Sequence, residues 1–153
     1  GLSDKAGAAV AVALTRASAA PVKVVKLGHN CGLSRQTACA LGCLLASNSK
    51  IQELDLFRCG LDVEACAALL EGLAAPALKK LILQSSGLGT RGGAALAAAV
   101  QKGALPALEE LHLNDCKLGD EAGTELLQAL ARRTEATSPL RMLGLNDNGL
   151  GAG

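Results

Sequence analysis

Residues 51–61 read Ile51-Gln-Glu-Leu-Asp-Leu-Phe-Arg-Cys-Gly-Leu61, with apolar residues at positions one, four, six and eleven. Residues 108–118 repeat this frame as Leu108-Glu-Glu-Leu-His-Leu-Asn-Asp-Cys-Lys-Leu118. The frame occurs five times, starting at residues 22, 51, 78, 108 and 140, so that successive copies begin 29, 27, 30 and 32 residues apart. Repeats of this length are typical of solenoids, in which each unit packs only on its neighbours. The first copy is one residue longer, because an extra residue after Leu27 puts Leu33 at position twelve.

Each frame predicts a short strand followed by a helix. Positions four and six fall on one side of an extended strand, and positions three, five and seven fall on the other. After the frame that ends at Leu118, we expect Asp120 to cap the following helix. Each helical stretch has an apolar stripe that opens with a small residue, such as Gly93 or Gly123, and we expect that residue to let helix and strand approach closely. Neighbouring repeats must therefore stack, with parallel strands on one face and helices on the other.

The repeats predict one continuous domain over residues 1–153. It consists of a helical half-repeat at 1–21, repeats starting near 22, 51, 78 and 108, and a partial repeat at 140–153. Residues 1–20 imitate a secretory signal, but Asp4 and the register shared with residues 118–130 favour a helix. Solenoids need polar caps, and neither end offers one. We therefore expect a segment of a longer solenoid, or ends that associate with another chain, including a second copy.

The composition limits the classes of partner. The chain has 15 basic and 14 acidic residues, whereas binding of phosphate backbones needs a surplus of Lys and Arg on one face. It has one Phe and no Tyr or Trp, so the stacking platforms of single-strand readers are missing. No apolar run approaches the ~20 residues of a membrane span. These observations predict no nucleic acid and no membrane partner, and favour a protein.

The six cysteines are interpreted as repeat positions, not as a disulfide framework. Cys31, Cys59 and Cys116 lie two residues before the last apolar residue of their frames, where Ser86 and Asn148 stand in two others. The remaining three lie in Ala-rich stretches and are expected to act as small hydrophobic residues: Cys39, Cys43 and Cys66. Free, buried thiols indicate a reducing compartment, so we predict an intracellular, cytoplasmic protein.

Three motifs suggest chemistry and are interpreted as products of the repeat. Residues 87–92 read Gly-Leu-Gly-Thr-Arg-Gly, a formal dinucleotide fingerprint, but its glycines recur at fixed frame positions, so no cofactor is predicted. His29 and His112 belong to different repeats and no Cys-x-x-Cys pair exists, so no metal site is predicted. Acidic, His and amide residues crowd positions 110–115, but neighbouring outward positions on a strand are normally solvated. The sequence therefore predicts no catalytic residue and no enzyme.

The frames at 51–61 and 108–118, with the helical continuations 62–73 and 119–130, resemble the leucine-rich repeat family. They are most similar to its long-repeat branch, typified by ribonuclease inhibitor, Ran GTPase-activating protein and the sensor regions of NOD-like receptors. The resemblance implies an α/β right-handed solenoid, a horseshoe segment with parallel strands on the concave face and helices on the convex face. It also implies a noncatalytic scaffold that binds a protein on the concave face. Two alternatives stay open: a GTPase-activating domain, or a purely structural subunit of a larger assembly.

The frame positions that point outward supply the candidate protein-binding residues. The first strand is basic and the last two are acidic or rich in amides, a gradient that would steer a polar protein ligand. Phe57, the sole aromatic, has two interpretations: a residue tucked under a neighbouring loop, or an interface anchor beside Arg58. The predicted binding residues are Lys26, His29, Glu53, Asp55, Phe57, Arg58, Lys80, Ile82, Glu110, His112, Asn114 and Asp115.

Overall fold

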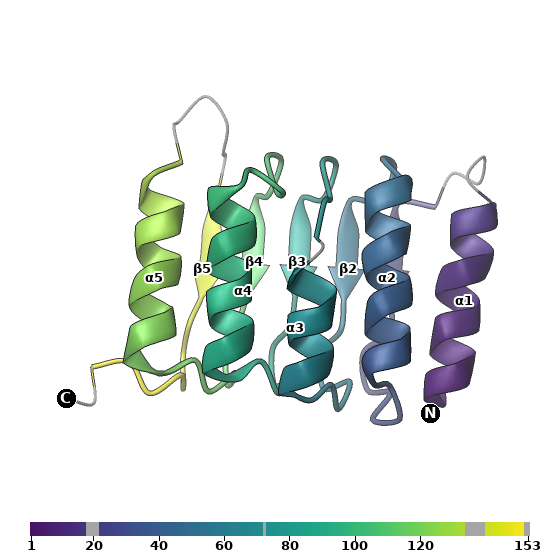
Figure 1. Cartoon of the computed structure of the whole chain (residues 1–153), viewed down its shortest axis with the longest axis horizontal. Coiled ribbons are helices and arrows are strands. Elements are labelled where there is room, and N and C mark those ends of the chain that lie inside the picture. Colours follow the sequence, from purple (N-terminus) through teal and green to yellow (C-terminus); the bar gives the residue numbers. More distant parts are fainter. Residues whose placement is uncertain (18–21, 72, 134–139, 152–153) are drawn as a thin grey trace.

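The computed structural model describes residues 1–17, 22–71, 73–133 and 140–151, and within them five helices alternate with five strands (Figure 1). The helices are α1 (Asp4–Arg16), α2 (Arg35–Ser47), α3 (Val63–Glu71), α4 (Gly89–Gln101) and α5 (Gly119–Ala131). The strands are β1 (Val24–Lys26), β2 (Glu53–Asp55), β3 (Lys80–Ile82), β4 (Glu110–His112) and β5 (Met142–Gly144). The predicted alternation of strand and helix is confirmed, and the helix predicted for the first half-repeat is α1.

The strands form one parallel sheet in the order β1-β2-β3-β4-β5. Position four of each frame pairs with position four of the next, which aligns Val25 with Leu54 and Leu81 with Leu111. A strand shifted by one residue would expose its Leu side chains, so the buried face fixes this register. The architecture is an α/β leucine-rich repeat solenoid, as predicted.

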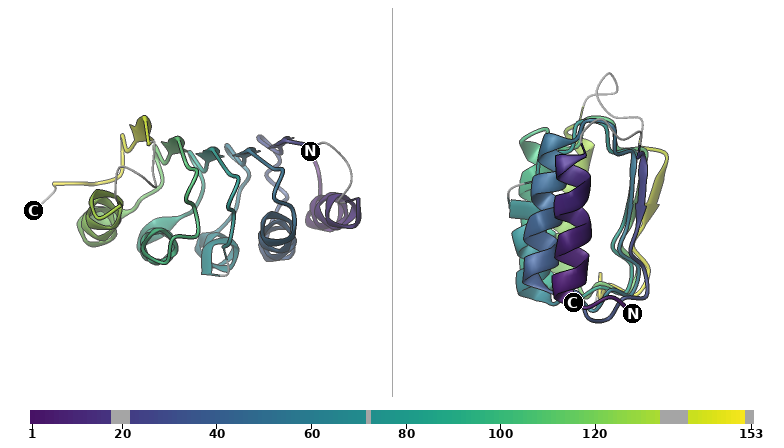
Figure 2. Two further views of the ribbon diagram at one scale, coloured as in Figure 1. Left: turned by 90° about the horizontal axis from the view of Figure 1, so that it is seen from above. Right: turned by 90° about the vertical axis from the view of Figure 1, so that its right-hand side faces the viewer.

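Strands and helices occupy two separate layers. Figure 2 shows the strands in one row and the helices in a second row that bows outward at α3. The frame leucines of the middle repeats fill the space between the layers, and Leu54, Leu83 and Leu111 are at most 1% exposed. Full burial of a Leu side chain stabilises the fold by about 1.5–3 kcal/mol. The core is therefore a set of leucine ladders shared between adjacent repeats.

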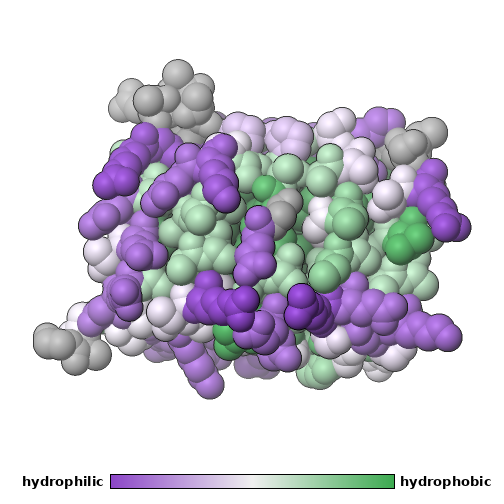
Figure 3. Space-filling model, in the orientation of Figure 1, coloured by the Kyte–Doolittle hydropathy of each residue, from purple (hydrophilic) through white to green (hydrophobic). Residues whose placement is uncertain are grey.

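The end repeats are less covered than the middle ones. Leu143 and Leu145 are only partly buried, and Leu150, which closes the last frame, is 38% exposed. Figure 3 shows a helix face made mostly of weakly hydrophobic residues, with hydrophilic residues gathered at the helix starts and over the far ends of α4 and α5. A residue at an end has a neighbouring repeat on one side only, which accounts for its exposure.

Acidic residues at the helix starts connect successive repeats. Asp4, in the first turn of α1, accepts hydrogen bonds from the backbone N–H groups of Ser34 (2.8 Å) and Thr37 (2.9 Å) at the start of α2. Asp120 occupies the equivalent position in α5 and accepts from the N–H of Gly151 in the next repeat. The prediction that Asp120 caps its own helix is therefore wrong, because its carboxylate reaches the following repeat. Asp62, by contrast, caps its own helix.

The small residue that opens each helical stripe contacts the next repeat. A Cβ atom placed on Gly93 would lie 2.8 Å from a methyl group of Leu118 and 2.9 Å from the side chain of Ala122. A Cβ on Gly7 would likewise lie 2.7 Å from a methyl group of Leu33. We expected these residues to let helix and strand approach closely. The structure shows that they set the spacing between successive repeats.

Position nine of each frame holds a polar or thiol group that binds the preceding repeat. The Oγ of Ser86 donates to the carbonyl of Leu56 (3.2 Å), and the Sγ of Cys116 donates to that of Leu83 (3.1 Å). In the first frame the equivalent residue is Asn30, whose Nδ2 donates to the carbonyl of its own Leu27. The assignment of Cys31 to this position is therefore wrong. Asn30 occupies position nine, and the extra residue of this frame lies after it.

Candidate functional site

The outward side chains of the five strands form a continuous surface, which we call the strand face. In β2, β3 and β4 the middle residue is buried and its two neighbours are partly exposed, as the frame predicts. The sheet register sets equal frame positions side by side, so that Glu53 lies between Val24 and Lys80. The strand face comprises Val24, Lys26, Glu53, Asp55, Lys80, Ile82, Glu110, His112, Met142 and Gly144.

Ion pairs join neighbouring strands across the strand face. The Nζ of Lys26 lies 3.2 Å from Oε1 of Glu53, and the Nζ of Lys80 lies 2.6 Å from Oε2 of Glu110. That Glu110 oxygen also lies 3.1 Å from Nε2 of His112. Hydrogen bonding from Lys80 lowers the pKa of Glu110, and the same bond raises the pKa of Lys80. Glu110 is therefore held ionised at neutral pH, so the group favours a fixed arrangement of charges over proton transfer.

These pairs also alter the charge gradient read from the sequence. Lys26 is paired with Glu53, so the basic end of the strand face is partly neutralised. Surface ion pairs of this kind contribute about 0–1 kcal/mol to stability, but they restrict the side chains that a ligand meets.

Phe57 sits in a cluster at the ends of β1 and β2. Its ring meets the edge of the His29 ring at a centroid distance of 4.9 Å and an angle of 90°, and the Arg58 guanidinium lies 5.1 Å from its centroid. Its backbone N–H donates to Oδ1 of Asp55 (2.9 Å). Position seven of the preceding repeat is Gly28, whose missing side chain leaves room next to the ring. Phe57 is thus half-buried and held by neighbours on two sides, yet it still faces the strand side of the molecule.

Position eight of every frame adopts the left-handed backbone region, a feature that the sequence interpretation missed. The residues are His29, Arg58, Ser85, Asp115 and Asp147, with φ between 50° and 63°. The first four turns direct a backbone N–H at the next repeat: that of Arg58, for example, donates to the carbonyl of Gln84, and that of Ser85 to the carbonyl of Asn114. His, Ser and Asp at one frame position were a signal, because Asn, Asp and His tolerate this region better than most residues. Four of the five side chains in this position-eight row are exposed to solvent.

Asn114 has a structural task in addition to its predicted binding role. Its Oδ1 accepts from the N–H of Asn146 (2.9 Å), and its Nδ2 donates to Oε1 of Gln84 (3.4 Å). Asn114 thus links three successive repeats at position seven. Asp115, one residue further, is exposed and available to a ligand.

Two glycine amides of the motif at residues 87–92 are already bonded within the solenoid. The N–H of Gly87 donates to the carbonyl of Leu61 (2.8 Å), and that of Gly89 donates to the carbonyl of Cys116 (2.9 Å). A dinucleotide site needs such N–H groups free at the helix start. The repeat uses them instead to connect adjacent turns.

The cysteines divide into two groups. Cys59, Cys66 and Cys116 are buried, and desolvation raises the pKa of the first and third to about 11 and of Cys66 to about 12, so they stay protonated and unreactive. The expectation of burial is wrong for the other three, which are exposed: Cys31, Cys39 and Cys43. α2 turns its two cysteines outward, whereas Leu41, Leu44 and Leu45 of the same helix face the core.

Metal-ligand clusters and membrane-spanning helices are both absent from the described residues. They contain no cluster of three His, Cys, Asp or Glu side chains arranged to hold a metal ion. They also contain no helix with the length and apolar character required to cross a bilayer.

Comparison with known proteins identifies the class. Residues 47–70 and 105–127 match the family model described as Leucine Rich repeat. The two matches cover the second and fourth frames and their strands, and the other strands continue the same register. The two matched segments are therefore leucine-rich repeats, units that typically provide noncatalytic surfaces for protein interaction, and the chain folds as an α/β leucine-rich repeat solenoid. No curated protein matches the chain.

Proposed function

We propose that this chain is a noncatalytic interaction domain that binds a protein partner on its concave strand face. The observation that carries the proposal is the register of the sheet, which gathers the partly exposed residues of five repeats into one surface. A ladder of backbone hydrogen bonds fixes that surface before binding. A preorganised surface loses little conformational entropy when it binds.

The chemistry of the strand face favours a partner that presents an apolar side chain surrounded by polar groups. Ile82 is partly exposed at the middle of the sheet, and Phe57 lies two residues beyond the end of the neighbouring strand β2. Charged groups surround them, among them Asp55, Arg58 and the ion pair of Lys80. Interfaces commonly place an aromatic or Arg anchor at the centre and polar residues at the rim.

Site-specific photocrosslinking tests which face binds. A photoreactive phenylalanine analogue is placed at Ile82 on the strand face, and in a matched variant at Glu125, which is exposed on α5. In extracts of the native source, we expect a protein to crosslink at Ile82 and not at Glu125. Crosslinking of the same protein at Glu125 alone would refute strand-face binding.

Once that protein is purified, Phe57→Ala tests the anchor. We expect affinity to fall about 10- to 100-fold, because truncation of a central aromatic residue costs about 2 kcal/mol or more. Leu127→Ala, at an exposed apolar residue on α5, is the control and should leave affinity unchanged. Unchanged affinity of Phe57→Ala, with normal folding, would show that the ring only braces His29 and Arg58.

The finer assignments belong to the same proposal. The repeat length and the helical continuations support the ribonuclease-inhibitor-like branch and one domain over residues 1–153. The six free cysteines support an intracellular, cytoplasmic location. The GTPase-activating alternative rests on family analogy alone, and single-turnover GTP hydrolysis with a bound GTPase tests it. Light scattering tests a purely structural role and end-to-end association, which predict assemblies larger than a monomer.

A further inference from the structure

The position-eight row changes sign along the solenoid. In chain order, His29 and Arg58 are basic, Ser85 is neutral, and Asp115 and Asp147 are acidic. All five share the left-handed backbone conformation, and backbone hydrogen bonds hold successive turns side by side. Neighbouring strands lie about 4.8 Å apart, so the row extends over about 19 Å. Its charge pattern is therefore a fixed feature of the surface.

The charges of this row are not used within the chain. In the residues that the structure describes, none of Arg58, Asp115 and Asp147 joins an ion pair. The rest of the chain contains no Lys, Arg or His that could pair with either aspartate. Arg58 lies over the Phe57 ring, but its side chain is exposed. Both ends of the row are thus available to a charged partner.

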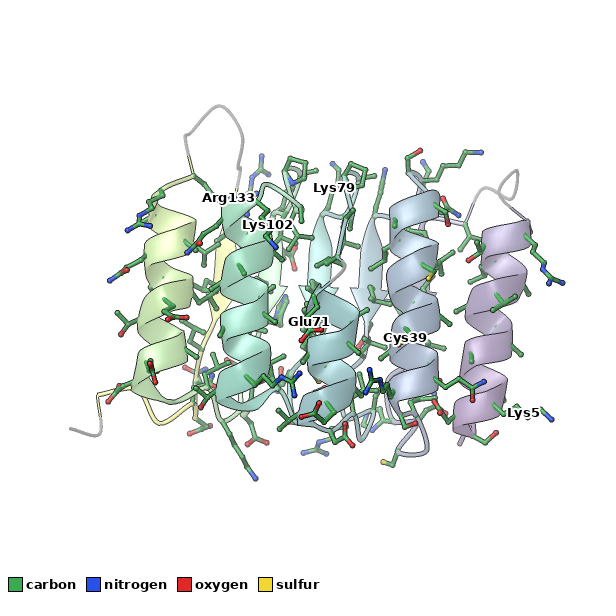
Figure 4. All side chains as sticks on the ribbon, in the orientation of Figure 1. Lys5, Cys39, Glu71, Lys79, Lys102 and Arg133 are labelled. Carbon is green, nitrogen blue, oxygen red and sulfur yellow. The ribbon has the colours of Figure 1, made fainter. Side chains whose placement is uncertain are left out.

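The other end of the strands has no such pattern. Position two of the frames holds Lys23, Gln52, Lys79, Glu109 and Arg141, whose signs do not reverse about the middle repeat. Lys79, which Figure 4 shows near the start of β3, is already paired with Glu109 at 2.9 Å. The sign reversal therefore belongs to the turns that follow the strands.

The row is complementary to a second copy of itself. A half-turn about an axis parallel to β3 and above Ser85 brings two strand faces together and reverses the order of the repeats. β2 of one copy then lies opposite β4 of the other, and β1 lies opposite β5. Arg58 faces Asp115 and His29 faces Asp147, and each contact occurs twice because the interface is isologous. Ser85 meets its own copy at the axis, where a charged residue would be repelled by its equivalent.

The strand face fits the same arrangement. The helices lie on the other side of the strand layer and do not obstruct it (Figure 2). Val24 of one copy lies opposite Met142 of the other, and these are the most exposed apolar residues of the strand face, at 47% and 49%. Solenoid faces curve inward, so two facing copies approach each other most closely at these ends.

Position three places like charges opposite each other, but these are offset within each chain. Glu53 lies opposite Glu110, and Lys80 lies opposite its own equivalent. Glu53 is paired with Lys26, and Lys80 is paired with Glu110. The unpaired charges of the position-eight row therefore decide the orientation.

We propose that the strand face and the position-eight row form the interface of a symmetric homodimer, in which Arg58 of each copy binds Asp115 of the other. The proposal rests on the proposed function, because it names a second copy of this chain as the partner of the strand face. This surface covers about 500 Å² per copy, less than the ~800 Å² of a standard interface. The dimer is therefore weak, and its affinity depends on ionic strength.

Sedimentation equilibrium of the purified chain tests the dimer. Between about 10 μM and about 1 mM at low salt, we expect monomer and dimer and nothing larger, because an isologous interface is closed. Addition of about 0.5 M NaCl should raise the dissociation constant about fivefold or more. Larger assemblies would overturn the proposal in favour of end-to-end association. A monomer at every concentration would also refute it, whereas the binding of another protein to the strand face is decided separately by photocrosslinking.

Charge reversal tests the predicted contact. Arg58→Asp and Asp115→Arg each place like charges opposite each other and should raise the dissociation constant at least tenfold. Both residue types already occupy left-handed positions in this row, so we expect the fold to be kept, as circular dichroism can verify. An equimolar mixture of the two variants should dimerise again, because one variant supplies two acidic groups and the other two basic groups.

Two matched controls change the net charge by the same amounts on the helix side. Arg35→Asp on α2 and Glu125→Arg on α5 are at exposed positions and should leave the dissociation constant within twofold. Equal weakening by these controls would show that only net charge matters. Failure of the mixture to dimerise would refute the contact between Arg58 and Asp115.

Discussion

Removal of the Asp4 carboxylate is expected to loosen the junction between α1 and α2. That carboxylate accepts from two backbone N–H groups at the start of α2, and from the hydroxyls of Ser34 (2.6 Å) and Thr37 (2.7 Å). Hydrogen bonds to a charged group contribute about 1.5–3 kcal/mol, and loss of a helix cap costs about 0.5–2 kcal/mol. Because Asp4 is partly exposed, we take the lower part of this range. We expect Asp4→Ala to cost about 2 kcal/mol and Asp4→Asn, which keeps an acceptor, about 1 kcal/mol.

The same contact predicts a pH dependence with a definite sign. Burial disfavours the charged form of Asp4, but the hydrogen bonds from Ser34 and Thr37 outweigh it and bring the pKa well below its usual range. An unfolded Asp titrates near 3.9. The stabilisation is therefore complete above about pH 5, and it is lost as the pH falls through the unfolded value toward the folded one. The stability difference between wild type and Asp4→Ala should narrow by up to about 1.4 kcal/mol per pH unit below pH 4.

Urea denaturation at pH 7, 5 and 3 measures both effects. Asp115→Asn, at an exposed carboxylate of the position-eight row, is the control and should change the free energy of unfolding by less than about 0.5 kcal/mol. A loss below 0.5 kcal/mol for Asp4→Ala at pH 7 would refute the cap. A difference that stays constant from pH 7 to pH 3 would show that the charge of Asp4 plays no part.

Two further substitutions test the core and the row of left-handed turns. Leu83→Ala should lower the free energy of unfolding by about 2–5 kcal/mol, because Leu83 is fully buried between adjacent repeats, and a loss below 1 kcal/mol in urea would contradict that placement. Ser85→Gly should raise the free energy of unfolding by about 0.5–1 kcal/mol. The left-handed φ of 53° is strained for Ser but not for Gly, and removal of this strain outweighs the entropy that glycine adds to the unfolded chain. Thermal unfolding measures the gain. A lower melting temperature would show that the Ser85 side chain contributes more than the strain.

Much of the fold was predictable because it depends on spacing. An eleven-residue frame repeated at nearly constant intervals leaves one arrangement in which the frame leucines of the middle repeats are buried, and that arrangement fixes strand order and register. The outward strand residues were predictable for the same reason, since side chains alternate along a strand. The interpretation of Cys59 and Cys116 as repeat positions followed from their recurrence at one frame position.

Other features depend on contacts between residues that are distant in the sequence. The burial of Cys66 and the exposure of Cys39 depend on how each helix is rotated against its neighbours, which the Ala-rich sequence leaves open. Asp4 and Asp120 each bind a backbone amide about one repeat further along the chain, a distance that no local capping rule includes. Arg133 likewise donates to the carbonyl of Leu105, which lies in the preceding repeat.

The sequence by itself determined the repeat, the ladder of buried leucines and the surface that faces outward. These features follow from the period of the apolar residues, because only one arrangement of strands and helices buries them. Only the tertiary structure decided which carboxylates connect one repeat to the next and which thiols meet solvent. These contacts depend on how whole repeats pack against one another. The sequence of a single repeat does not determine the position of its neighbour.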